Sequence, residues 1–63
     1  MYIDIEWTKT STRLPPNGLI VQTKIDDPIN GVRNLCYLIR YGNEWCVPFE
    51  GVAVLYVPTH WRA

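Results

Sequence analysis

Few side chains in this chain could carry out covalent chemistry. Ser11 is the only serine and His60 the only histidine, so a Ser–His–acid triad could be built only from these two and one carboxylate. No nucleophile elbow surrounds Ser11. His60 lies between Thr59 and Trp61 near the end of the chain, a setting typical of a hydrogen-bonded structural or surface histidine. We therefore predict that the protein is not an enzyme.

The remaining candidates for chemistry are two cysteines and an acidic pair. Cys36 and Cys46 lie in apolar runs that suit inert thiols, and two cysteines are too few for a disulfide scaffold. Together with His60 they fall short of the four ligands of structural zinc. Asp26 and Asp27 could contact a cation but lack further spaced oxygens, so turn capping is the better interpretation. The sequence predicts no metal and no cofactor.

Aromatic and basic residues in the second half of the chain favour binding. Aromatics interleaved with basic residues on a sheet are typical of single-stranded nucleic-acid binding. A formal net charge of zero opposes that interpretation, because affinity for phosphate backbones comes from basic charge. Exposed aromatic and arginine side chains are also typical anchors of protein–protein interfaces. The predicted partner- or ligand-binding anchors are Tyr37, Arg40, Tyr41 and Trp45.

A polar segment near the N-terminus offers a different kind of site. Residues 8–13 carry only hydroxyl and cationic side chains, which can contact a phosphate group. Lys9 and Arg13, with two aromatics, would suffice for a pocket that holds one nucleotide or cyclic signal molecule, even in a chain without net charge. We include both residues among the candidate binding residues. A solvated polar loop is the simpler interpretation of the same segment.

Short strands separated by turns must position these side chains. Period-two runs dominate the chain and no window has a helical stripe, so we predict an all-β fold. Prolines and glycines mark loops at 8–18 and 26–31. We expect one domain, residues 1–63, folded as a five- to six-stranded antiparallel barrel or meander, SH3-like in size. The expected strands are 1–7, 19–25, 34–41, 44–47 and 52–57, to which the tail 58–62 could add a closing strand.

The dipeptide Gly42-Asn43 predicts a hairpin with a defined register. It fits a two-residue type II′ turn, which pairs Tyr41 with Glu44, Arg40 with Trp45, and Ile39 with Cys46. The register places Arg40 against Trp45 in a cation–π contact. It also places Cys36 opposite Phe49, about 10 Å along the strand from Cys46, beyond the ~7 Å limit for a disulfide. We predict two free thiols.

Both faces of this hairpin are apolar. One face collects Leu35, Tyr37, Ile39 and Cys46, and the other collects Cys36, Leu38, Val47 and Phe49. A lone antiparallel sheet normally turns one polar face to water. A chain this small buries only about 60% of the surface that its unfolded form exposes, so it has little material to cover a second apolar face. We expect self-association or partner binding there; the alternative is that the tail 57–61 folds back over it.

Several spaced motifs resemble a family of short phage and prophage proteins of unknown function. In that family a tryptophan, an Arg-Leu-Pro and a glycine precede the first long strand, an aromatic strand ends in glycine and tryptophan, and Thr-His-Trp lies near the end. The matching residues are Trp7, Arg13-Leu14-Pro15, Gly18, Val21, 37–42, Trp45 and Thr59-His60-Trp61. The loop 26–33 is not covered, and the family's proline-rich tail has no counterpart after Ala63. The resemblance implies a phage or prophage origin, no defined activity, and a barrel core that contains Trp7, Leu14 and Trp61.

The resemblance and the residues together suggest how the protein acts. Short phage proteins often work by stoichiometric binding, which implies an accessory protein that inhibits or masks a host or defence protein. We expect a homo-oligomer, because a chain of this size needs contacts with another molecule. The alternative is a small β-barrel that sequesters a nucleotide or cyclic signal, or binds single-stranded nucleic acid. The N-terminus does not resemble a signal peptide, and no apolar run approaches ~20 residues, so we expect a complete cytoplasmic protein without membrane contact.

Overall fold

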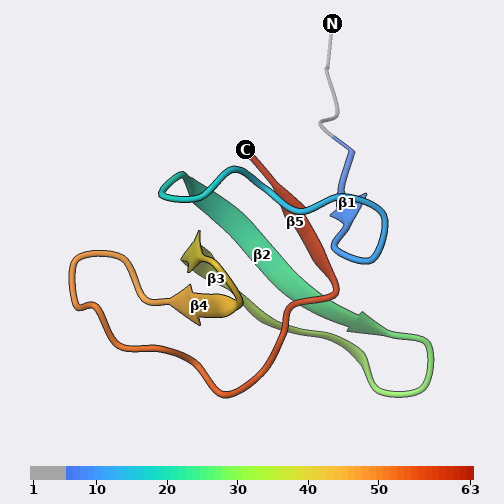
Figure 1. Ribbon diagram of the computed structural model, residues 1–63. Helices are drawn as coiled ribbons and strands as arrows, with labels where there is room; N and C mark the ends of the chain where they lie inside the picture. The colour runs from blue at the N-terminus through green and yellow to red at the C-terminus, as the bar shows by residue number, and fades with distance from the viewer. Residues whose placement is uncertain (1–5) are drawn as a thin grey trace, which may run out of the picture.

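The computed structural model describes residues 6–63, which form a single antiparallel sheet (Figure 1). Its strands are β1 (Thr8–Lys9), β2 (Ile20–Asp27), β3 (Gly31–Tyr41), β4 (Glu44–Cys46) and β5 (His60–Arg62). The described residues contain no helix, so the all-β prediction is confirmed. Among residues 6–63 there is likewise no helix that could cross a membrane. The expected first strand, 1–7, lies outside the described residues except for its last two positions, which belong to no strand.

The strand order is β1-β5-β2-β3-β4. Hairpins connect β2, β3 and β4, and β5 then returns through a long connection to lie beside β2. This order is that of a Greek key, with β1 added outside β5. The sheet is open, because no pairing joins its edge strands β1 and β4 within the described residues.

The hairpin between β3 and β4 has the predicted register. Tyr41 pairs with Glu44, Arg40 with Trp45, and Ile39 with Cys46. Gly42 has a positive φ of 62° and Asn43 does not, as a type II′ turn requires. The predicted cation–π contact is wrong: the guanidinium of Arg40 instead donates hydrogen bonds to backbone carbonyls. Phe49 does not lie opposite Cys36 as expected, because β4 ends at Cys46. On its other side Cys36 pairs with Thr23 of β2.

The prediction of a strand at 52–57 is also wrong. Only Ala53 makes a β-bridge, with Cys46, and the chain then leaves the sheet edge. The start of this segment is held by hydrogen bonds from Val47 N to Val52 O, at 2.8 Å, and from Val54 N to Trp45 O, at 2.7 Å. Beyond them the connection packs Val54 and Tyr56 against the core instead of extending the sheet. The tail does supply the closing strand β5.

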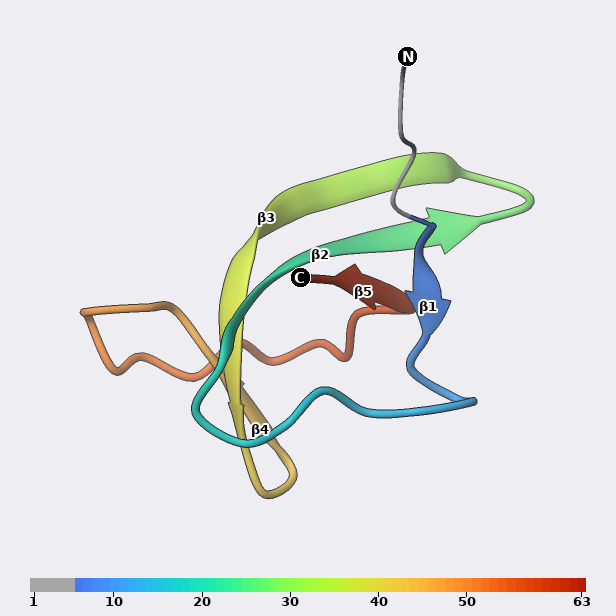
Figure 2. The same cartoon turned by 90° about the horizontal axis from the view of Figure 1, so that it is seen from above.

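A β-bulge bends the long strand β3. Between the pairs Thr23–Cys36 and Ile25–Arg33, two residues of β3 oppose one residue of β2. Asn34, the first of the two, has a positive φ of 57°, which asparagine tolerates better than most residues. Figure 2 shows the resulting curvature, with the connection 10–19 and the later part of the connection 47–59 on the concave side of the sheet.

The core lies on this concave side. Its buried side chains are Val21, Leu38, Trp45 and Trp61. Connections cover them, with Pro15 and Pro58 fully buried. The buried hydroxyl of Thr23 donates to Cys36 O at 3.0 Å, so its polar group is satisfied.

The three residues proposed for the core have different environments. Trp61 is a core residue and Trp7 is half-buried. Leu14 is 47% exposed, contrary to expectation, because it lies on the loop that covers the core rather than beneath that loop.

Candidate functional site

The convex face of the sheet carries a row of exposed apolar side chains along β3. Because Val21 and Leu38 are buried on the concave side, residues one position away in each strand point to the convex side. Among them Tyr37 is 61% exposed, Leu35 60%, Tyr41 55% and Ile20 40%. Ile39, half-buried, lies between the tyrosines in sequence and pairs with Ile20. We call these five residues the outer face.

The outer face corresponds to one of the two apolar faces expected from the hairpin register. The tail does not cover it: β5 pairs with β1 and β2, and Trp61 packs into the core on the opposite side. Contiguous exposed apolar patches on small proteins commonly mark interaction sites. Tyrosine suits such a site because its ring supplies apolar area while its hydroxyl can remain solvated.

A cation–aromatic cluster occupies the other part of the convex side, over β2 and β5. The Trp7 ring centroid lies 4.5 Å from Lys24 Nζ and 4.3 Å from Arg62 Cζ. Lys24 also forms an ion pair with Asp26 at 3.3 Å, and its side chain is only 13% exposed. Arg62 Nε donates to Gln22 Oε1 at 2.7 Å. These cations therefore bind neighbours within the chain, and their first role is to fasten Trp7 to the sheet.

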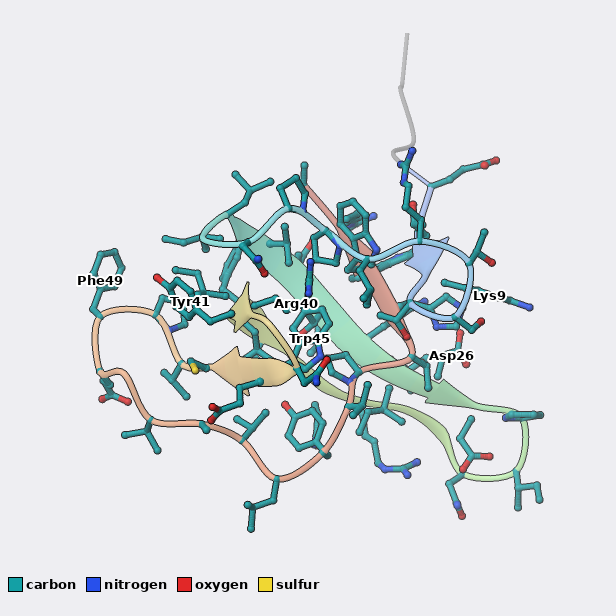
Figure 3. All side chains as sticks on the ribbon, viewed as in Figure 1. Lys9, Asp26, Arg40, Tyr41, Trp45 and Phe49 are labelled. Atoms are coloured by element: carbon teal, nitrogen blue, oxygen red, sulfur yellow. The ribbon has the colours of Figure 1, made fainter. Side chains whose placement is uncertain are left out.

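Two of the four predicted anchors lie on the concave side instead of the outer face. Trp45 is only 4% exposed and belongs to the core, which corrects the expectation of an exposed anchor. Arg40 donates to Pro15 O and to Gly42 O. Gly42 N in turn donates to Asn17 Oδ1 at 3.1 Å, so this arginine is part of a structural junction between the first loop and the hairpin (Figure 3). Alternation fails to identify the buried face here because both faces are apolar.

The polar loop does not converge with the tyrosines. Lys9 is exposed on β1, which β5 and β2 separate from β3. Arg13 lies over the ring of Trp61, with Cζ 5.7 Å from the centroid, and its carbonyl accepts a hydrogen bond from Trp61 Nε1 at 2.7 Å. The six candidate binding residues therefore do not form a single pocket.

The titratable candidates make local contacts. His60 Nδ1 lies 2.7 Å from Thr59 Oγ1, which accepts a hydrogen bond from Asp26 N at 2.7 Å. Asp27 Oδ1 accepts from Ile29 N at 2.8 Å, and this hydrogen bond lowers the pKa of the Asp27 carboxyl, in agreement with turn capping. Within residues 6–63 no three His, Cys, Asp or Glu side chains come together as a metal site.

The two cysteines are free thiols, as predicted. Cys36 Sγ lies 3.5 Å from Tyr56 Oη and 3.8 Å from Thr23 Oγ1. Burial and the contact with Cys36 raise the pKa of Tyr56 to about 12. Nothing in the sequence pattern indicated this contact, because it joins β3 to the irregular connection beyond β4.

Phe49 has an unusual backbone conformation and lies outside the sheet, contrary to the prediction from sequence. It was expected on an apolar sheet face, but it stands at the tip of the turn after β4, with its side chain directed away from the fold (Figure 3). It is 98% exposed and has a positive φ of 68°. A bulky residue with a positive φ is a conformational outlier.

Comparison of the chain with protein-family models, with curated proteins and with solved structures found no match. The resemblance to short phage proteins therefore stays a prediction.

Proposed function

We propose that the protein acts by stoichiometric binding, with its outer face docked against a protein partner. The observation that carries the proposal is the row Leu35, Tyr37 and Tyr41, more than half exposed on one side of a strand whose other side packs the core. Fully burying a large apolar side chain contributes about 1.5–3 kcal/mol. Several such side chains on one rigid strand can therefore supply the centre of an interface.

Occupancy rather than turnover is the proposed mode of action. His60 is tied to Thr59, and Cys36 lies against Thr23 and Tyr56, so these groups hold the fold together. A protein that works in this way would inhibit or mask a host or defence factor by covering part of its surface. This part of the proposal rests on the resemblance to short phage proteins, many of which act by stoichiometric binding.

The partner proposal can be tested by affinity capture from host lysate. The double variant Tyr37→Ala/Tyr41→Ala removes exposed rings from the outer face and is expected to lose the captured partner. Ile29→Ala is the matched control, because Ile29 is 89% exposed in the turn between β2 and β3, away from the outer face. Equal capture by wild type and the double variant would refute the role of the outer face.

A second candidate function is binding of a nucleotide or single-stranded nucleic acid. The observation that favours it is the cluster of Trp7, Lys24 and Arg62, which is separated from Tyr37 by Gln22 on the same side of the sheet, since aromatics with cations on a sheet can stack bases. Titration with single-stranded DNA at low and high salt tests it, because phosphate contacts weaken steeply with salt. Absence of a salt-sensitive complex, together with no thermal shift in a panel of mono-, di- and cyclic nucleotides, would remove this candidate.

A further inference from the structure

Most of the outer edge of β3 has no strand partner within the described residues. β4 pairs only with residues 39–41 of β3. In the described part of the chain, the residues of β3 before Ile39 pair on one side only, with β2. The Asn34 bulge interrupts this stretch and leaves Leu35–Leu38 as a straight segment, which we call the free edge. The segment has no charge and no proline, the usual features that prevent a strand edge from pairing.

The hairpin geometry determines which backbone groups point out of the free edge. Residues that flank a two-residue turn exchange both backbone hydrogen bonds, so Tyr41 directs its N–H and C=O toward β4. Every second residue of the strand directs its backbone groups to the same side, so the N–H and C=O of Tyr37 and Leu35 also point toward the outer edge. Two contacts agree: on the opposite side, Arg40 O accepts from Gly18 N at 3.0 Å, and Cys36 O accepts from the Thr23 hydroxyl of β2.

We propose that a second copy of this chain pairs with the free edge, β3 against β3, antiparallel across a two-fold axis. In the register that uses all outward groups of both copies, Leu35 of each copy lies opposite Tyr37 of the other. A register centred on Tyr37 brings Leu35 of one copy beside Ile39 of the other, where β4 already lies, and a register centred on Leu35 leaves the outward groups of Tyr37 unused. The chosen register requires β3 to leave the shared ladder at the Asn34 bulge, because Arg33 would otherwise reach that same position beside Ile39. The two sheets then become one continuous sheet, and the apolar side chains of Leu35 and Tyr37 meet across the axis.

Charge favours a second copy over an unrelated strand. The antiparallel arrangement brings the Arg33 end of one β3 toward the other copy's turn after β4, which carries Glu50. Arg33 is exposed and has one long ion pair, 3.7 Å to Asp27. Glu50 is exposed and makes no hydrogen bond or ion pair with residues 6–63. The pairing goes beyond the proposed function, because it joins two outer faces into one larger surface without covering either.

Sedimentation equilibrium of the purified full chain tests the proposal. We expect a dimer for wild type and for Tyr37→Phe, which keeps the backbone N–H. We expect a monomer for Tyr37→Pro, since proline removes an N–H that has no partner within one copy and blocks strand addition. The circular-dichroism unfolding midpoint of the monomeric variant shows whether it is folded. A dimer that survives in folded Tyr37→Pro, or a wild type that is monomeric at micromolar concentration, overturns the proposal.

Oxidative cross-linking supplies a readout that does not depend on the proline variant. In the proposed register the two Cys36 residues face each other as a non-hydrogen-bonded pair, with Cα atoms about 4.5 Å apart, within the range of a disulfide. Diamide, as oxidant, is expected to link Cys46→Ser into a covalent dimer and to leave Cys36→Ser unlinked. A dimer linked through Cys46 instead, or no cross-link in Cys46→Ser, contradicts the register. Because only purified protein is used, these outcomes are independent of partner capture by the outer face.

Discussion

Arg40 and Pro15 form the main polar junction between the first loop and the central hairpin. The guanidinium donates to the carbonyl of Pro15 from Nε at 3.1 Å and from Nη2 at 2.8 Å, and from Nη1 to Gly42 O at 2.6 Å. Pro15 is fully buried, so this junction holds part of the covering layer over the core. A residue expected to bind a partner therefore makes structural contacts within the fold.

Removal of this junction is expected to destabilise the protein. Arg40→Ala leaves the buried Pro15 carbonyl without its charged donor, and hydrogen bonds to charged groups contribute about 1.5–3 kcal/mol. We expect a loss of that size in the free energy of unfolding, measured by urea denaturation. Arg33→Ala is the control, since its single long ion pair at the surface contributes at most about 1 kcal/mol. Equal stability of the two variants would contradict the structural role of Arg40.

Trp45 and Tyr41 should respond in opposite ways to truncation. Trp45→Ala removes one of the few buried core side chains, and such changes cost about 3–5 kcal/mol, enough to unfold a small domain. Tyr41→Ala removes a ring that is mostly in solvent and should change stability by about 0.5 kcal/mol or less. Thermal unfolding followed by circular dichroism compares them. A folded Trp45→Ala with an unchanged midpoint would show that the hairpin packs with its faces reversed.

Replacement of Phe49 is expected to stabilise the isolated protein. Phe49→Gly relieves a positive φ, whose cost in a residue with a side chain is about 1–3 kcal/mol, and loses almost no buried area. The added freedom of glycine in the unfolded chain offsets part of this gain. Phe49→Asn, which tolerates the same conformation, should behave similarly. A lower unfolding midpoint for both variants would mean that the phenyl ring makes contacts that hold the turn.

The environment of Tyr56 predicts a loss of stability at high pH. Its pKa is raised from an ordinary value of 10.0 to about 12, so the folded state favours the neutral phenol. This contribution is fully present below pH 10 and is lost as the pH rises toward 12. Unfolding midpoints measured from neutral to alkaline pH should therefore fall more steeply in wild type than in Tyr56→Phe. Parallel curves for the two proteins would exclude the effect.

Local sequence signals were sufficient for part of the fold. The pair Gly42-Asn43 predicted the β3–β4 register because a two-residue turn leaves one choice of pairing. It also predicted two apolar faces, but the pattern could not show which one is buried. That choice depends on the connection that carries Val54 and Tyr56 over the sheet. Trp45 was therefore assigned to the exposed side, although it is buried, whereas Tyr37 and Tyr41 are exposed on the outer face.

The other errors also arise from long-range packing. Residues 52–57 are a continuous apolar run of the kind found in strands, but the chain must then cross to the far side of β2 to form β5, so this segment does not remain a strand beside β4. Arg40 makes no cation–π contact with Trp45 because its guanidinium binds the carbonyl of the buried Pro15, on a loop that is distant in sequence. Phe49 follows a strand that ends earlier than its apolar pattern suggested.

The position of β5 has a consequence for the folding kinetics. Among residues 6–63, β1 pairs with β5 alone, and its Thr8 lies opposite Trp61, so this pairing joins two segments that are more than 50 residues apart in sequence. The hairpins β2–β3 and β3–β4 need only short loop closures, whereas docking of β5 requires closure of the whole 47–59 connection. We expect a fast phase in which the central hairpins form, followed by a slower phase in which Trp61 becomes buried. The rate of the slow phase should depend on the length of that connection.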